Sequence, residues 1–118
     1  MIRSVGNNQA ALQAYSTKLN TNANNIANVN TDNFKRQDAV IEQNQQSQPT
    51  AKVRTDNTPG PVKTTISAKG QQKVQELSNT DLTKEFTSTI TAQRGYEANL
   101  KALETNDQMA GSIINIKG

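Results

Sequence analysis

Apolar residues return every seven positions near both ends of the chain, and this recurrence constrains the fold more than any other feature. At the N-terminal end the series comprises Val5, Leu12, Leu19 and Ile26. A period of seven residues places these side chains along one stripe of an α-helix and is typical of helices that pair with each other. We therefore predict long helices near residues 3–30 and 80–116 that pack antiparallel or nearly so.

Polar residues interrupt these stripes at regular places. The C-terminal helix carries one register of Phe86, Gln93, Leu100, Asp107 and Ile114, beside a second of Leu82, Thr89, Tyr96, Leu103 and Ala110. Asn22, Gln93 and Asp107 would face a partner helix, where a polar residue costs stability but restricts register and partner number. We predict that the assembly and coiled-coil interface is made by Leu12, Tyr15, Leu19, Asn22, Ile26, Val29, Phe86, Gln93, Tyr96, Leu100, Leu103 and Asp107.

The segment between the helices has a different character. AKVRTD and PVKTTIS alternate apolar and polar residues around the turn-forming NTPG, which predicts a short β-hairpin or two extended pieces. QDAVIEQ could be another extended piece, and EQNQQSQPT contains no apolar residue before its proline and is expected to be a mobile loop.

The expected fold class is therefore mainly α. Long N- and C-terminal helices pair as a coiled coil, with a small β-hairpin or loop segment between them. The expected parts are an N-terminal helix within residues 1–33, a β or loop segment over 34–78 and a C-terminal helix within 79–118, which together form one composite domain.

Composition excludes most enzyme chemistry. The 118 residues include no cysteine and no histidine, so thiolate or imidazole nucleophiles, bases and metal ligands are excluded. Asn28, Asn30 and Asp32 have the spacing with which a calcium loop begins, but Asn33 stands where glycine is required and Ala39 where a glutamate is required. We expect no catalytic residues, no cofactor and no metal.

The chain also has no apolar run of the length that a membrane-spanning helix or a signal-peptide core requires. We expect neither membrane insertion nor a cleaved signal peptide. Only 22 residues are Val, Ile, Leu or Phe, against 15 Asn, 12 Gln and 14 Thr, a composition that favours an extended molecule over one with a large enclosed core.

Positive charge is concentrated in the middle of the chain. Residues 34–75 contain seven Lys or Arg and three acidic residues, so a small coiled-coil adaptor or regulator that binds an acidic partner or nucleic acid is the alternative function. Phe34 is the one aromatic residue there that could stack on a base. A solvated basic surface is the simpler interpretation, and we expect no nucleic-acid binding.

Two motifs resemble a known family. LNTNANNIANVNTDNFKR, residues 19–36, is similar to the N-terminal signature of bacterial flagellar axial proteins, the subunits of the rod and hook. NTDLTKEFTSTITAQRGYEANLKALETNDQM, residues 79–109, resembles the terminal helix of the same family. Asn33 replaces the usual glycine of the first motif, and asparagine tolerates the left-handed conformation expected there.

The resemblance implies a structural subunit of the flagellar basal-body rod or hook. Such a subunit would be exported through the flagellar type III apparatus without cleavage and would polymerise into a helical tube through its terminal helices. Its partners would be copies of itself, neighbouring axial proteins and the export apparatus, and its location the periplasm-spanning rod or the hook. The length is that of small rod subunits, whereas the C-terminal motif is closer to hook and distal-rod subunits.

Overall fold

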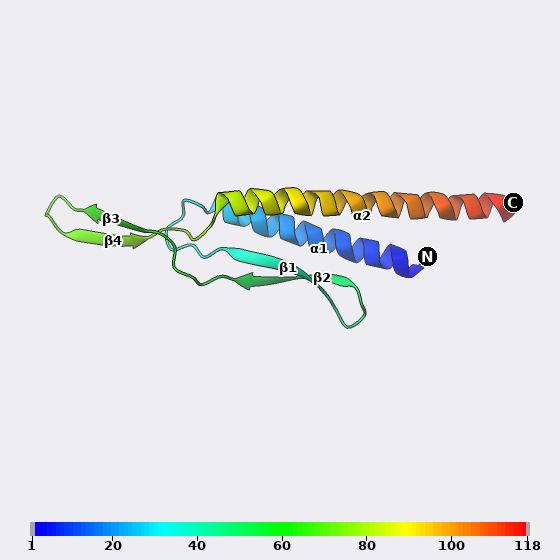
Figure 1. The fold of residues 1–118 in the computed structure, drawn as a ribbon, viewed down its shortest axis with the longest axis horizontal. Helices are drawn as coiled ribbons and strands as arrows, with labels where there is room; N and C mark the ends of the chain where they lie inside the picture. The colour runs from blue at the N-terminus through cyan, green and yellow to red at the C-terminus, as the bar shows by residue number, and fades with distance from the viewer. Residues whose placement is uncertain (1, 118) are drawn as a thin grey trace.

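The structure is a computed structural model that describes the backbone of residues 2–117 and the side chains of residues 5–115. Two helices dominate it, α1 (Ile2–Ala27) and α2 (Leu82–Lys117). They lie side by side and antiparallel, so both chain ends are at the same end of the molecule (Figure 1). The molecule measures 85 × 25 × 15 Å, which agrees with the extended shape expected from its composition. Among the described residues, no helix is long and apolar enough to cross a membrane.

Local polar contacts define where the helices meet the middle segment. Asp81 caps α2, because its Oδ1 accepts hydrogen bonds from the backbone N–H groups of Thr83 and Lys84, at 3.1 and 3.4 Å. The chain leaves α1 through a turn in which Asn33 adopts the left-handed conformation, with φ of 61°. The Asn33 N–H then donates to the carbonyl of Glu76 (3.0 Å), so the replacement of the expected glycine is tolerated as predicted.

The middle segment forms two antiparallel hairpins. The first pairs β1 (Gln37–Gln43) with β2 (Pro49–Thr55), and the second pairs β3 (Val62–Ile66) with β4 (Gln72–Glu76). Of the two alternatives for AKVRTD and PVKTTIS, the short β-hairpin is wrong, because β2 and β3 belong to different hairpins and NTPG lies in the link between them. The alternative of two extended pieces is confirmed, as is the extended piece at QDAVIEQ, which is β1.

The tract expected to be a mobile loop is also shorter than predicted. Its ends belong to β1 and β2, and only residues 44–48 connect the strands. The Oδ1 of Asn44 accepts from the backbone N–H groups of Gln46 and Gln48, both at 2.9 Å. This asparagine turn closes the hairpin without apolar residues, which is why a tract with no apolar content can still be ordered.

The two hairpins have different surroundings. β1–β2 runs alongside α1, which lies between this hairpin and α2, whereas β3–β4 projects beyond the helices at the end opposite the chain termini (Figure 1). The residues of β3 are all exposed, and Ala39 of β1 is buried. Only the second hairpin therefore lies at an end of the helix pair, while the first covers a side of α1.

The core is built from small side chains. Ala11, Ala14 and Ala92 are buried, and the side chain of Asn25 is fully buried. At Gly95 of α2, an added Cβ would lie 2.5 Å from the Cζ of Tyr15, so the tyrosine ring of α1 occupies the space that the glycine leaves. Small residues let neighbouring elements pack closely against more than one side of α1. These close contacts exclude water from the core although the chain has few large apolar residues.

Candidate assembly interface

A buried polar cluster joins α1, α2 and β1. The Asn25 amide donates to the carbonyl of Gln37 (2.7 Å) and accepts from the N–H of the same residue (2.9 Å). The Asn22 amide, oriented to satisfy both of its neighbours, donates to Oε2 of Glu85 and accepts from Oγ of Ser88, both at 3.1 Å. Each of these polar groups is therefore paired, and the bonds of Asn22 to Glu85 and Ser88 join α1 to α2.

Glu85 is the ionisable member of this cluster and is only 3% exposed. Burial raises the pKa of its carboxyl above the ordinary value of 4.5, and the negative charge of Asp38 acts in the same direction. A hydrogen bond from Asn25 and the positive charges of Arg36 and Lys84 oppose the rise. The cluster thus contains a carboxylate whose ionised form is disfavoured by its surroundings.

A second polar cluster holds the segments that leave the helices. The Arg36 guanidinium forms an ion pair with Asp56 at 2.7 Å, and the Arg36 N–H donates to Oδ1 of Asn79 (2.7 Å). The Asn79 amide donates to the carbonyls of Asp56 (2.8 Å) and Thr58 (2.9 Å). Hydrogen bonds from Thr58, and then from Arg36, lower the pKa of Asp56 to about 2.

The base of the β3–β4 hairpin is fastened beside this cluster. The Glu76 carboxylate is paired with Lys35 and accepts from the N–H of Gly60 (2.9 Å), and these two bonds lower its pKa. A Cβ on Gly60 would lie 2.2 Å from the carbonyl oxygen of Leu77, so only glycine fits this close approach of two backbones. The position of the hairpin relative to the helices is therefore fixed by local contacts at its base.

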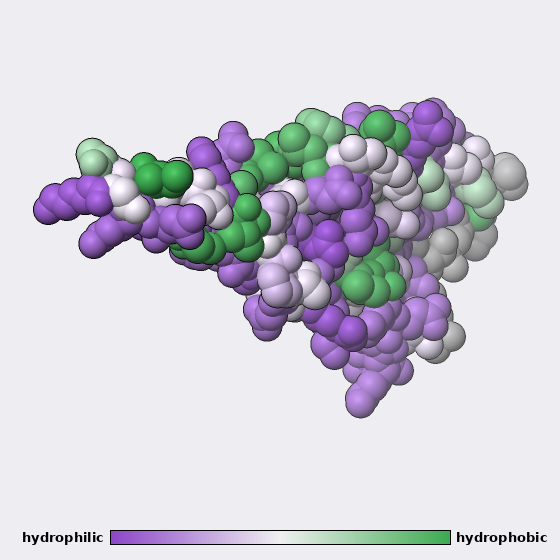
Figure 2. All heavy atoms as spheres, turned by 60° about the vertical axis from the view of Figure 1, so that its left-hand side comes forward, coloured by the Kyte–Doolittle hydropathy of each residue, from purple (hydrophilic) through white to green (hydrophobic). Residues whose placement is uncertain are grey.

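An apolar stripe remains exposed on the first turns of α2. Leu82, Phe86 and Ile90 recur at intervals of four residues and are 39%, 53% and 55% exposed. Residues at this spacing lie on one side of a helix. Figure 2 shows hydrophobic atoms in a band that runs from the projecting hairpin along the upper edge of the molecule, where α2 lies. Such a band on a small protein is typical of an interaction surface.

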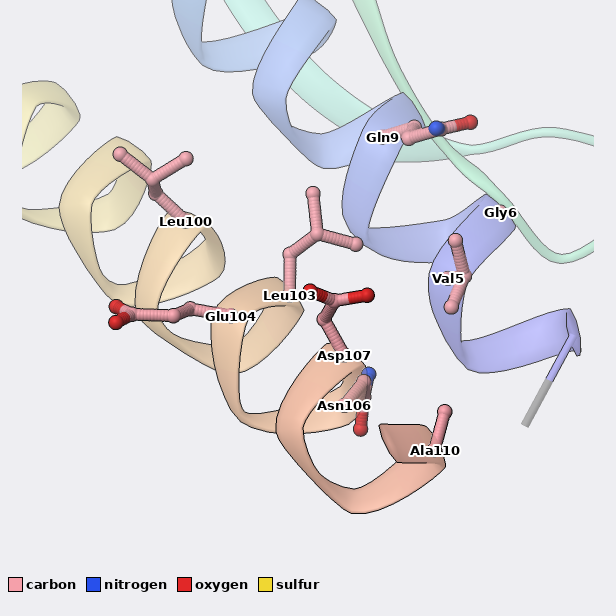
Figure 3. Close-up of a pocket in the computed structure, with 9 residues that line it drawn as sticks. All are labelled: Val5, Gly6, Gln9, Leu100, Leu103, Glu104, Asn106, Asp107 and Ala110. Carbon is pink, nitrogen blue, oxygen red and sulfur yellow. The ribbon is translucent and has the colours of Figure 1, made fainter. Parts of the chain in front are cut away.

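A groove opens between the helices toward their free ends. Its volume is about 990 Å³. The side chain of Leu103 points into the gap between α1 and α2, and Asp107 points the same way, whereas Glu104 points away from α1 (Figure 3). The residues that line it are Val5, Gly6, Gln9, Leu100, Leu103, Glu104, Asn106, Asp107 and Ala110.

The predicted interface residues are divided between the two sides of the helices. Asn22 is buried, and half-buried positions are occupied by Leu12, Tyr15, Leu19, Ile26, Val29, Tyr96 and Leu103. The register of Phe86, Gln93, Leu100 and Asp107 is exposed, with Phe86 at 53% and Leu100 at 49%. Phe86 and Gln93 are therefore exposed in the single chain, while Leu100 and Asp107 line the groove between the helices. The role of this register in an assembly interface stays a prediction.

The register that faces α1 starts one residue earlier. It comprises Glu85, Ala92, Asn99 and Asn106, which are buried or half-buried. Because α2 lies beside the Tyr15 ring and close to the α1 backbone, the side facing α1 favours a small side chain such as that of Ala92. The larger side chains of Phe86 and Gln93 fit less well there. The sequence signal for this face is a seven-residue recurrence of small and polar residues. A search for apolar recurrence does not find this signal, and it does not find the buried Asn25 of α1 either.

Within the part of the chain that the structure describes, no group of three or more His, Cys, Asp or Glu residues could hold a metal ion. The surfaces that the chain offers to a partner are the exposed stripe of α2, the groove and the projecting hairpin.

Comparisons with known proteins match both ends of the chain. Residues 7–35 match the family described as flagella basal body rod protein. Residues 71–116 match the family described as flagellar basal body rod FlgEFG protein C-terminal. Together the two matches cover well over half of the chain. They include the helical residues that form the groove and the buried polar cluster, except for the first residues of α1.

Individual relatives agree with these matches. Flagellar basal-body rod protein FlgG of Bacillus subtilis is 48% identical over 42 residues, which is 36% of this chain and 16% of the relative. Flagellar hook protein FlgE of Helicobacter pylori is 45% identical over 42 residues, and FlgE of Escherichia coli is 40% identical over 42 residues. These two matches each cover 36% of this chain and, respectively, 6% and 10% of the relative.

The matched part spans less than a fifth of the length of each of these relatives. Two independent segments at opposite ends of the sequence nevertheless identify the same group of proteins, and the fold brings those two segments together as neighbouring antiparallel helices (Figure 1). The chain belongs to the flagellar axial protein family of basal-body rod and hook subunits.

Proposed function

We propose that this chain is a structural subunit of the flagellar basal-body rod or hook that polymerises into a helical tube through its terminal helices. One observation carries the proposal. The two segments that match rod families, residues 7–35 and 71–116, contain the helices that lie side by side, and α2 still exposes an apolar stripe. A helix pair with an uncovered stripe has the property required of a subunit completed by its neighbours.

In this proposal the helices pair as a coiled coil whose outer side contacts other subunits. Leu82, Phe86 and Ile90 supply apolar area, while Gln93 and Asp107, which are exposed in the single chain, set the alignment of neighbouring subunits. A polar group that is satisfied in one alignment penalises the others. A tube requires contacts between two different patches, so closed two-fold dimers are not the working form.

The partners are other copies of the chain, neighbouring axial proteins and the flagellar export apparatus. The location is the periplasm-spanning rod or the hook, reached by export without a cleaved signal peptide. The chain has no catalytic role and needs no cofactor, since its activity is assembly.

The first test is whether the chain is a component of purified basal bodies and whether its deletion abolishes motility. The second test is the variant Phe86→Ser. Because Phe86 is half-exposed in the single chain, the unfolding temperature of the monomer should stay within a few degrees of that of the natural chain. Export should continue while polymer formation is lost. Thr87→Ala, an exposed change on a different side of the same turn, is the control.

Absence from basal bodies together with normal motility in the deletion strain would contradict the proposal. Salt-sensitive binding of the unassembled chain to nucleic acid would instead favour the adaptor function, because the basic middle segment would then carry the activity.

A further inference from the structure

We propose that the β3–β4 hairpin of one copy docks into the groove between the free ends of α1 and α2 of a second copy. The inference rests on the proposed function, since it names one contact by which subunits would join. It is carried by four observations: an uncovered hairpin face, an open groove, their places at opposite ends of the molecule, and their charges.

The hairpin has an apolar face that the rest of the chain leaves uncovered. Val62, Ile66 and Val74 are 60%, 71% and 65% exposed. They share one face, because Val62 and Ile66 are four residues apart on β3 and Val74 is paired with Thr64 between them. A two-stranded sheet without further packing is marginally stable in water, so this hairpin gains order from any partner that covers the face.

The groove offers apolar surface of the matching kind. Val5, Leu100, Leu103 and Ala110 line it from both helices, and Leu100 is 49% exposed. Its volume of about 990 Å³ leaves room for several side chains of a hairpin. Burial of the three hairpin side chains there would remove apolar area from water on both partners.

The hairpin and the groove lie at opposite ends of the long axis. β3–β4 projects from one end of the 85 Å molecule, and the free ends of α1 and α2 lie at the other (Figure 1). A contact between two different patches at opposite ends joins copies head to tail and does not close on itself in a two-fold dimer. This geometry suits an open polymer.

Charge favours a second copy as the occupant. Residues 61–75 contain Lys63, Lys69 and Lys73 and no acidic residue. The groove carries Asp107 within it and Glu104 at its outer side, the latter paired with Lys101 at 3.3 Å. A lysine can lay its aliphatic stem along apolar surface while its ammonium group reaches a nearby carboxylate. The lysine at the hairpin turn, Lys69, is the cation best placed to approach Asp107.

Cysteine cross-linking tests the contact directly, since the natural chain has no cysteine. Ile66→Cys and a ¹⁵N-labelled Leu100→Cys chain are mixed under conditions in which the natural chain assembles, oxidised briefly and weighed by mass spectrometry. We expect the mixed disulfide dimer to form in clear excess over the mixture of Thr65→Cys with Leu100→Cys. Thr65 neighbours Ile66 but lies on the opposite face of the hairpin.

A charge exchange provides the second test. Lys69→Glu should weaken association about three- to tenfold in sedimentation, and Asp107→Lys in the same chain should restore it, because each reversal replaces one attraction by repulsion. Folding of each variant is checked by circular dichroism. Both positions are exposed, so their substitution should leave the monomer folded.

The outcomes separate this inference from the proposed function. If polymers form normally and the Ile66 and Thr65 mixtures cross-link equally, the hairpin contact is wrong while the assembly function stands. Preferential cross-linking of Phe86→Cys to Leu100→Cys would assign the groove to the α2 stripe of another copy and would also overturn the inference. Absence of the chain from basal bodies would remove the proposed function and the inference together.

Discussion

The side chain of Asn25 in α1 forms two hydrogen bonds with the backbone of one residue, Gln37, at the start of β1. The asparagine is fully buried, so neither of its polar groups can exchange these partners for water. This pair attaches the first hairpin to the helix and turns the chain back along α1 after the left-handed turn at Asn33. The amide of Asn25 therefore fixes where β1 begins relative to α1.

Replacement of Asn25 by alanine should lower the free energy of unfolding by about 2 to 4 kcal/mol, because it removes two bonds and leaves the N–H and carbonyl of Gln37 without them. Urea unfolding followed by circular dichroism measures the change. Asn24→Ala removes the same side chain from an exposed neighbour and should have a much smaller effect. Equal losses in both variants would show that the buried amide does not anchor β1.

The buried carboxyl of Glu85 should make stability fall as pH rises. Its pKa is raised above 4.5 in the folded chain, so the folded state binds more protons than the unfolded state at pH values between 4.5 and the raised value. The free energy of unfolding decreases across that interval. Glu85→Gln removes the titration, so its stability relative to the natural chain should increase as pH rises from about 4.5 through the raised pKa of Glu85.

Guanidinium unfolding at several pH values tests this prediction. Glu97→Gln, at an exposed position on the same helix, reports the effect of removing one negative charge from α2 without removing the buried group. A stability difference between Glu85→Gln and the natural chain that is independent of pH would show that folding does not raise the pKa of Glu85.

Two glycines of α2 should respond oppositely to alanine. Gly111 has open space around the position of a Cβ, so Gly111→Ala should stabilise the helix by about 1 kcal/mol. Gly95→Ala gains the same propensity but meets the Tyr15 ring, and the resulting overpacking should make it less stable than Gly111→Ala by about 1 to 3 kcal/mol. Thermal unfolding of both variants measures the difference. Equal gains would mean that Tyr15 moves aside without cost.

Gly60 should tolerate no side chain. Gly60→Ala places a Cβ against the backbone of Leu77, so the base of β3–β4 must shift and the bond from the Leu77 N–H to the carbonyl of Pro61 (2.7 Å) should weaken. Faster hydrogen exchange at the Leu77 amide is the expected readout. Gly6→Ala, where the nearest outside atom to a Cβ is 3.9 Å away, should leave that amide unchanged. Unchanged exchange in Gly60→Ala would contradict the close approach.

The sequence by itself determined that both ends of the chain are helical, because a seven-residue recurrence is a local property that survives in any tertiary arrangement. It also determined the left-handed turn at Asn33 and the extended middle segment. The two end motifs carried the family assignment, since each is read within one stretch of chain.

Only the tertiary structure decided which side of α2 faces α1 and which strands pair. Periodicity establishes that a stripe exists on α2. Whether the register of Phe86 or that of Glu85 faces α1 depends on how closely the two helices approach each other beside Tyr15. Strand pairing depended on where the backbone is fastened, at Asn25 for the first hairpin and at Glu76 and Gly60 for the second. These contacts join residues far apart in sequence, so they arise only when packing, burial and hydrogen bonding are satisfied together.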